Sequence, residues 1–159
     1  MAKNTGLKIA LCLALLLALR VAGQQPIANY PQTYFRNPLD IPILLAGNFG
    51  ECRLGHFHSG LDIKTLGREN MPVHAAADGY ISRIKMDKGG FGHALYITHP
   101  NGYTTLYAHL NDFIPKLQQY LKRQQYEKKR WDLDMTLQPS QFPVKQGDLI
   151  AYSGNTGGS

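Results

Sequence analysis

Hydrophobic and polar residues alternate along the middle of the chain, as they do in half-buried β-strands. Turn-forming groups separate the alternating stretches, at Lys88-Gly89-Gly90 and at Pro100-Asn101-Gly102. We therefore predict strands over residues 80–86, 94–99 and 103–110. A short apolar run over 73–77 ends at Asp78-Gly79, which predicts one more strand in a hairpin with 80–86. Together these strands indicate an antiparallel, β-rich domain.

The strand predicted over 103–110 has two distinct faces. One face carries Thr104, Leu106, Ala108 and Leu110, and the other carries Tyr103, Thr105, Tyr107 and His109. We expect the more apolar first face to pack into a core. The second face would then line a groove, in which the candidate substrate contacts Tyr107 and Tyr103 stand beside His109.

The stretch 112–141 interrupts the strand pattern. Asp112 is a suitable N-cap and Pro115 suits the first turn of a helix. Apolar residues follow at helical spacing, namely Ile114, Leu117 and Leu121. We predict a helical insertion over 112–141, followed by strand, turn and strand over 142–151.

The first 54 residues differ from the rest of the chain. Residues 1–23 combine two lysines, an apolar run over 9–19 and small residues near position 23, which together predict a secretory signal peptide. The apolar run is short for a membrane span, and an N-terminal anchor is the alternative. Residues 24–54 predict an extended lead-in with one strand-like piece. We therefore expect export, to the periplasm, the cell envelope or the extracellular space.

Composition and charge limit the classes of protein that fit. The chain has 159 residues, of which 43% are hydrophobic, as expected for one folded domain rather than a disordered chain. Removal of residues 1–23 lowers the formal net charge from +6 to +3. That remaining excess lies in the predicted insertion. A solvated helix explains it, and contact of the basic helix 116–130 with an anionic envelope polymer or a membrane is the alternative. The charge pattern indicates no nucleic-acid partner.

One cluster among the six histidines suggests metal chemistry. His58 and Asp62 stand four residues apart, and imidazole and carboxylate groups are good Zn²⁺ ligands. In a straight strand their Cα atoms would lie about 13 Å apart, so the segment must bend, and Gly60 permits a bend. This HxxxD pattern alone is weak, since a structural Asp and a surface His form it equally well. Cys52 is expected to be a small buried residue rather than a nucleophile.

Four blocks of sequence supply the context that the pair lacks. They read, in order, FHSGLDIKT, VHAAADGYISRI, GGFGHALYITHPNGYTTLYAHL and VKQGDLIAYSGNTG. In this order they resemble the lysostaphin-type (LytM-type) zinc metallopeptidases, the murein endopeptidase family. The resemblance predicts a metallopeptidase domain over 55–159, interrupted by the insertion. It implies an all-β fold in which an antiparallel, barrel-like sheet (the duplicated hybrid motif) carries a groove.

The same resemblance implies roles for particular residues. His58 and Asp62 are implied as the first two zinc ligands, and His109 as the active-site histidine that does not bind the metal. The family's third ligand is the second His of an HxH motif on the next strand, which we expect beyond Ser159. The chain is then expected to be a fragment of a longer enzyme. A short form that cannot act alone is the alternative.

The implied activity is zinc-dependent hydrolysis of peptide bonds in the stem peptides or cross-bridges of peptidoglycan, which serves cell-wall remodelling or lysis. The implied cofactor is Zn²⁺, and the implied partner is a peptidoglycan peptide. A non-catalytic domain of the same family, which binds peptidoglycan or activates an amidase, is the alternative.

Overall fold

The computed structural model of the protein describes residues 32–158. The predicted signal peptide and the beginning of the lead-in lie outside the described residues. From Thr33 onward the described chain belongs to one compact unit. No helix in this part of the chain is both long and apolar enough to cross a membrane.

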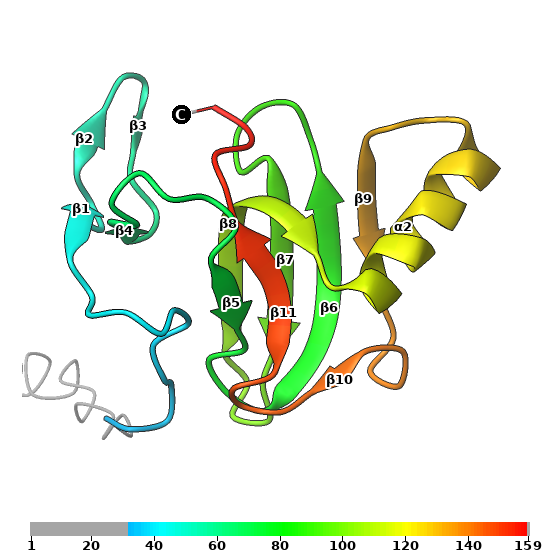
Figure 1. The fold of residues 1–159 in the computed structure, drawn as a ribbon, viewed down its shortest axis with the longest axis horizontal. Helices are drawn as coiled ribbons and strands as arrows, with labels where there is room; N and C mark the ends of the chain where they lie inside the picture. The colour runs from blue at the N-terminus through cyan, green and yellow to red at the C-terminus, as the bar shows by residue number, and fades with distance from the viewer. Residues whose placement is uncertain (1–31, 159) are drawn as a thin grey trace, which may run out of the picture. The chain divides into compact units, whose positions relative to one another are not determined.

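The main sheet is antiparallel and has seven strands in the order β10–β6–β7–β8–β11–β5, with β9 paired to β6 as well (Figure 1). Its strands are β5 (Pro72–His74), β6 (Gly79–Met86), β7 (His93–Thr98), β8 (Thr104–Phe113), β9 (Leu133–Thr136), β10 (Pro143–Val144) and β11 (Leu149–Ser153). The all-β prediction is confirmed, and the sheet stays open instead of closing into a barrel.

Two small two-stranded sheets precede the main sheet in the chain. Strand β1 (Leu45–Gly47) pairs with β4 (Asp62–Ile63), and β2 (Cys52–Arg53) pairs with β3 (His56–Phe57). We refer to residues 45–63 as the β1–β4 lobe. Main-chain hydrogen bonds connect the preceding lead-in to the main sheet, because Arg36 donates to the carbonyl of Ala76.

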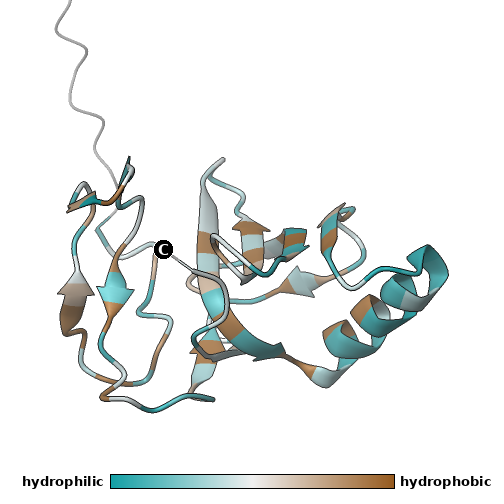
Figure 2. Ribbon diagram, turned by 90° about the horizontal axis from the view of Figure 1, so that it is seen from above, coloured by the Kyte–Doolittle hydropathy of each residue, from teal (hydrophilic) through white to brown (hydrophobic). Residues whose placement is uncertain are grey.

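The core lies on the sheet and continues under the helix. A bulge between Ile81 and Arg83 in β6 lets both Ile81 and Ile84 face inward, and both are fully buried. Helix α2 (Pro115–Lys128) adds Leu117 and Leu121, which stand four residues apart on its buried face. Outside these positions the helix is largely hydrophilic (Figure 2). The helix is therefore held by a narrow apolar stripe.

Strand β8 departs from simple alternation at a bulge. Against β7, Leu95 lies opposite Tyr107 and His93 lies opposite Leu110, so that two residues of β8 face one of β7. The buried side chains are Tyr107 and Leu110, whereas Leu106 is 39% exposed. The prediction that Thr104, Leu106 and Ala108 face the core was wrong, because the extra residue reverses the faces within one strand.

Tyr107 lies in the core and not in an open groove. Its side chain is 8% exposed, and burial raises the pKa of its hydroxyl. The backbone N–H of Ala76 donates to the Tyr107 hydroxyl at 2.8 Å, and the Thr105 hydroxyl lies 3.1 Å from it. Thr105 in turn contacts His99 Nε2 at 2.8 Å. The phenol therefore connects β8 to the buried segment after β5.

Replacing Tyr107 by phenylalanine is expected to destabilise the protein, because the buried Ala76 N–H loses its acceptor. The expected loss in the free energy of unfolding is about 1–3 kcal/mol. Urea unfolding followed by circular dichroism measures it. Tyr126→Phe is the matched control on an exposed helix position, with an expected change within about 0.5 kcal/mol. Equal stability of the two variants would contradict the assigned role of the hydroxyl.

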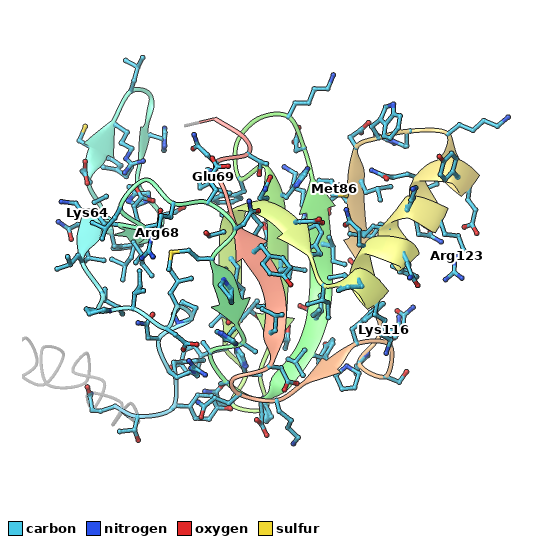
Figure 3. All side chains as sticks on the ribbon, viewed as in Figure 1. Lys64, Arg68, Glu69, Met86, Lys116 and Arg123 are labelled. Atoms are coloured by element: carbon cyan, nitrogen blue, oxygen red, sulfur yellow. The ribbon has the colours of Figure 1, made fainter. Side chains whose placement is uncertain are left out.

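The insertion contains a strand as well as the predicted helix. Helix α2 begins with Pro115 in its first turn, but Ile114 is the N-cap and Asp112 still belongs to β8. After Lys129 turns the chain in a left-handed conformation, β9 returns antiparallel to β6. Its buried residues alternate with exposed ones, a strand pattern hidden among charged residues. The basic side chains Lys116, Lys122, Arg123 and Lys128 are exposed, and Lys116 and Arg123 project from the helix in Figure 3.

The predicted hairpin between 73–77 and β6 does not form. Strand β5 pairs with β11 and lies at the far end of the sheet from β6. Neither Asp78 nor Gly79 has the positive φ that a two-residue type I′ turn requires. Instead Asp78 accepts hydrogen bonds from the backbone of Gln146 and from Lys145, which lower its pKa. The strand–turn–strand prediction over 142–151 is confirmed by β10 and β11.

Candidate metal centre

The β1–β4 lobe holds the predicted metal ligands His58 and Asp62. Asp62 begins β4, and His58 lies in the connection between β3 and β4. Both main-chain groups of His58 are fixed, because its N–H donates to the Glu51 carbonyl and its carbonyl accepts from the Gly50 N–H, each at 2.8 Å. The position of the imidazole is therefore set by the β2–β3 hairpin and not by a regular strand.

The chain bends between the two residues and brings their side chains together. His58 Nε2 lies 3.2 Å from Asp62 Oδ1. Two donors bound to one Zn²⁺ at about 2.0–2.2 Å with tetrahedral geometry lie about 3.3 Å apart, so this separation fits a shared ion. The bend does not use a left-handed conformation at Gly60. The two side chains are 14% and 35% exposed, which leaves them accessible from solvent.

The hydrogen bonds of His58 determine which of its nitrogens is free for a metal. Nδ1 lies 2.9 Å from the carbonyl oxygen of Asn48, which can only accept, so Nδ1 carries the proton. In the neutral ring, Nε2 then presents a lone pair to a carboxylate oxygen. Two acceptors at this distance need a cation between them, either a proton or a metal ion. Backbone-anchored Nδ1 is also the usual arrangement of metal-binding histidines.

Asp62 is positioned by Arg53 and by Gly47. Arg53 Nη2 lies 2.5 Å from Asp62 Oδ2, and this hydrogen bond raises the pKa of the guanidinium. The ion pair occupies one carboxylate oxygen and leaves Oδ1 directed at His58. A Cβ atom at position 47 would lie 2.6 Å from Asp62 Oδ2 and 2.4 Å from Arg53 Nη2. A side chain at position 47 would therefore require the Arg53 guanidinium and the Asp62 carboxylate to move from where they stand.

No third metal ligand joins this pair within the described part of the chain. Among residues 32–158, no group of three or more His, Cys, Asp or Glu side chains could hold a metal ion together. A catalytic zinc site normally has three protein ligands and an open position for water. The described residues bring together two candidate donors, one fewer than such a site needs.

His109 lies in the β8 bulge with the backbone in the left-handed region, at φ +55°. Such a conformation is uncommon for a residue other than glycine, and it often marks a functional position. Its N–H donates to the Phe91 carbonyl at 2.9 Å, and its Nδ1 lies 2.8 Å from the Thr156 carbonyl oxygen. Because that carbonyl accepts the Nδ1 proton, Nε2 is the basic nitrogen of the neutral ring.

Two loops interlock to hold the Thr156 carbonyl in place. The Thr156 hydroxyl donates to the Leu110 carbonyl at 2.7 Å and accepts the N–H of His93 at 2.9 Å. At Gly92, whose φ is +61°, a Cβ atom would lie 2.4 Å from the backbone carbon of Thr156. A side chain at position 92 would therefore separate the loops and release His109.

The other residues singled out by the sequence patterns lie elsewhere. Tyr103 is 45% exposed, and its ring centroid lies 6.4 Å from that of Phe35. Tyr107 is buried, as described above. His99, which follows β7, is 3% exposed, and its Nδ1 lies 2.7 Å from the carbonyl oxygen of Asp78, the residue before β6. The prediction that Cys52 is buried was wrong, because β2 is a short strand of an exposed hairpin and the thiol is free.

Sequence reasoning missed the residues that position the pair. Gly47 and Asn48 have the composition of an ordinary turn, and Arg53 stands nine residues before its partner Asp62. None of them stands at a strand or helix spacing from His58 or Asp62, so sequence periodicity does not link them to the pair. Asn48 stands ten residues before His58, and its carbonyl reaches the His58 ring because the intervening chain folds back. The HxxxD pattern gives no indication of this fold.

Comparison with known protein families matches residues 56–126 to peptidase family M23. The chain is 34% identical over 102 residues to DD-carboxypeptidase/endopeptidase Mpg of Neisseria meningitidis serogroup B, which covers 64% of this chain and 17% of that protein. A Haemophilus influenzae protein described as an uncharacterized metalloprotease is 30% identical over 100 residues, covering 63% and 16%. The cell division protein DipM of Caulobacter vibrioides is 30% identical over 79 residues, covering 50% and 13%.

The chain thus spans less than a fifth of the length of each of these relatives. The family match contains His58, Asp62 and His109. Residues 56–126 are therefore similar to peptidase family M23, in agreement with the resemblance of the four sequence blocks to the LytM-type metallopeptidases.

Proposed function

We propose that the protein is an exported zinc metalloendopeptidase that cleaves peptide bonds in the stem peptides or cross-bridges of peptidoglycan. The observation that carries the proposal is the His58–Asp62 pair, with its donor atoms 3.2 Å apart and directed at one another. Export rests on the signal-peptide pattern of residues 1–23. The substrate class rests on the family and on the relative named DD-carboxypeptidase/endopeptidase.

In this proposal His58 Nε2 and Asp62 Oδ1 hold the zinc ion. A bound Zn²⁺ lowers the pKa of water to about 7 and polarises a carbonyl group. Asn48 keeps the His58 ring in the tautomer that binds metal, and Arg53 keeps one oxygen of Asp62 away from it. We propose that the third ligand comes from the HxH strand that the resemblance to the family places after Ser159.

His109 is the proposed catalytic residue. With Nδ1 bonded to the Thr156 carbonyl, Nε2 can take a proton from the attacking water and later return it to the leaving amine. The bulge helps to set the direction of the ring, because the left-handed backbone conformation and the hydrogen bond from the His109 N–H to the Phe91 carbonyl fix the main chain of this residue. The residue therefore acts by proton transfer and not by binding the metal.

Incubation of the full-length protein encoded by the natural gene with purified peptidoglycan tests the proposal. We expect new amino termini in the released muropeptides by mass spectrometry, loss of the reaction with EDTA and its return with Zn²⁺. Binding to peptidoglycan without any cleavage would instead support the non-catalytic member of the family. Cleavage that persists in EDTA would contradict the role of the metal.

Replacing Gly47 by alanine is expected to weaken zinc binding, because the new methyl group displaces the Asp62 carboxylate. The expected loss of affinity is about 10- to 100-fold, as for other residues that orient metal ligands. Isothermal titration with Zn²⁺ measures it. Gly89→Ala is the matched control, since a Cβ atom there meets nothing within 4 Å. Unchanged affinity in Gly47→Ala would show that Gly47 does not position Asp62.

A further inference from the structure

A hollow of about 780 Å³ lies where the end of helix α2 meets the sheet. It is lined by the end of β6, the loop after it, the last turns of α2 and the start of β9, and neither His58 nor Asp62 contributes to it. Its apolar lining comes from Met86, Leu133 and Trp131. Ligand pockets of proteins have similar volumes, of about 300–1,000 Å³. We refer to it as the Trp131 pocket.

Trp131 is the single tryptophan of the chain, and its side chain is 79% exposed. Its backbone is fixed, because Gln125 Nε2 donates to the Trp131 carbonyl at 2.8 Å. Because the side chain is so exposed, packing in the core does not explain why a tryptophan stands at this position. An indole in a pocket wall gives a flat apolar face with one N–H donor, a surface on which ligand rings stack.

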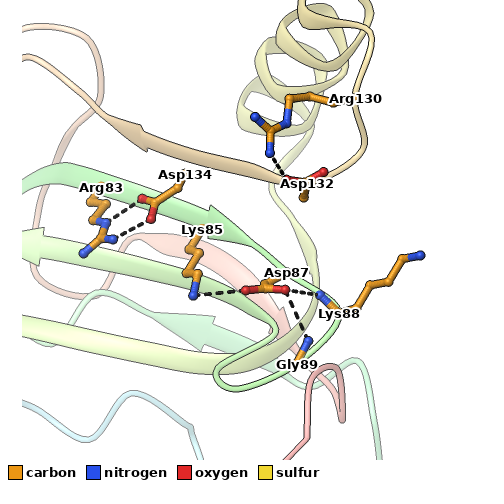
Figure 4. A network of polar contacts seen from close by, with 8 residues as sticks. All are labelled: Arg83, Lys85, Asp87, Lys88, Gly89, Arg130, Asp132 and Asp134. Atoms are coloured by element: carbon orange, nitrogen blue, oxygen red, sulfur yellow. Dashed lines mark hydrogen bonds and ion pairs between the residues drawn. The ribbon is translucent and has the colours of Figure 1, made fainter.

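Each carboxylate that lines the pocket is paired with a cation, and the cation is either in the lining or, for Asp134, the neighbouring Arg83 (Figure 4). Arg83 binds Asp134 through two hydrogen bonds, of 2.7 and 2.6 Å, Lys85 lies 3.1 Å from Asp87, and Arg130 pairs with Asp132. Each cation lowers the pKa of its partner carboxylate. The carboxylates are thus ionised acceptors held in place, beside donors of opposite charge.

Such a lining suits a neutral ligand that has many hydroxyl groups. Because every carboxylate of the pocket has a cation beside it, the pocket offers acceptors and donors without a strong excess of one charge. A polyanion would instead favour uncompensated cations, and the pocket has these only in Lys88 and Lys128. An exposed indole next to fixed carboxylates and amines matches the apolar face and the hydroxyl rim of a pyranose ring.

The pocket also adjoins the loops that hold the proposed catalytic residue. His93 lines the pocket, and its N–H donates to the Thr156 hydroxyl. The carbonyl of the same Thr156 accepts the bond from His109. In the sheet His93 lies opposite Leu110, the residue after His109. His93 therefore connects the lining of the pocket to the bulge that holds His109.

We propose that the Trp131 pocket binds the glycan strand of peptidoglycan, with a sugar ring on the indole and its hydroxyl groups on the paired charges. This inference rests on the proposed function, since it names the part of the same polymer that would carry the scissile peptides. In this inference the insertion, which contains α2 and β9, forms one side of the glycan-binding pocket.

Titration of the full chain with N-acetylglucosamine oligomers tests the inference, in EDTA so that no metal or peptide is involved. The single tryptophan reports directly, and we expect a saturable change in its emission with a dissociation constant below about 1 mM. By calorimetry, Trp131→Ala should weaken binding by about tenfold or more. Tyr126→Ala, which removes another exposed aromatic side chain that does not line the pocket, should leave it unchanged.

Three results would overturn the inference. These are no saturable response to the oligomers, equal affinity in Trp131→Ala and the unaltered chain, or a stronger response to polyphosphate or phosphatidylglycerol vesicles that salt suppresses. The last would assign the surface to an anionic polymer or a membrane. Sugar binding without peptidase activity would refute the proposed function alone, and peptidase activity without sugar binding would refute this inference alone.

Discussion

Replacing His58 by alanine is expected to abolish zinc binding, with a loss of affinity well above the 10- to 100-fold typical of residues that only orient a ligand. The variant removes one of the two proposed metal donors and leaves the Asp62 carboxylate paired with Arg53 alone. Peptidase activity of the gene product should disappear with the metal. Isothermal titration with Zn²⁺ and the muropeptide assay measure the two effects separately.

His56 provides the matched control for this variant. It is exposed and lies two residues from His58, and its ring Nδ1 lies 3.3 Å from the Leu54 carbonyl oxygen of its own hairpin, away from Asp62. His56→Ala should therefore bind zinc as the unaltered protein does. If His56→Ala loses zinc and His58→Ala keeps it, the HxxxD assignment is wrong.

Replacing His109 by alanine should separate catalysis from metal binding. We expect activity to fall by about 10²- to 10⁴-fold, which is the contribution of a general acid–base residue. Zinc affinity should stay within a few fold, because His109 is not among the proposed ligands. The muropeptide assay gives the rate, and calorimetry gives the zinc affinity of the same preparation.

The backbone at His109 calls for a second variant, since alanine is strained at φ +55°. Asparagine tolerates this conformation but cannot act as a base at neutral pH. His109→Asn should therefore keep the fold, shown by an unchanged urea midpoint, and lose activity to the same extent. Retained turnover in a folded His109→Asn protein would refute the assignment of His109 as the catalytic base.

The strands that follow a simple period could be predicted from the sequence. The run 94–99 alternates and corresponds to β7, and the run 80–86, which contains the bulge of β6, could be located by the glycine-containing turns on both sides of it. The faces of β8 could not be predicted, because one bulged residue at 108–109 exchanges core and surface, and alternation alone does not show where a bulge lies. Strand β9 was hidden because Asp132 and Asp134 gave its segment the pattern of a charged helix.

The pairing of strands was harder to predict than their positions. Asp78-Gly79 is a strong local hairpin signal, yet β5 joins β11 more than 70 residues later in the chain. The segment after β5 is buried at Ala75 and Ala76, and Gln146 donates hydrogen bonds to Ala76 and Asp78 from 70 and 68 residues later in the chain. Long-range contacts of this kind leave no periodic mark in a single sequence.

The candidate metal ligands could be proposed from the sequence because they stand in one short motif. His58 and Asp62 could be named from HxxxD and its neighbouring blocks, and the structure brings their side chains together. Arg53, Gly47 and Asn48 could not be named, because each acts through space on a ligand that is distant in sequence. The exposed Trp131 likewise looks like one more residue of a charged stretch until β9 places it beside β6.

A crystal structure of the protein grown with Zn²⁺, with data collected at the zinc absorption edge, tests the central claim most directly. The proposed site predicts an anomalous peak about 2.0–2.2 Å from both His58 Nε2 and Asp62 Oδ1. It also predicts that His58 Nδ1 still contacts the Asn48 carbonyl and that Arg53 still binds the other carboxylate oxygen. A zinc peak at other residues, with His58 and Asp62 bonded only to each other, would contradict it.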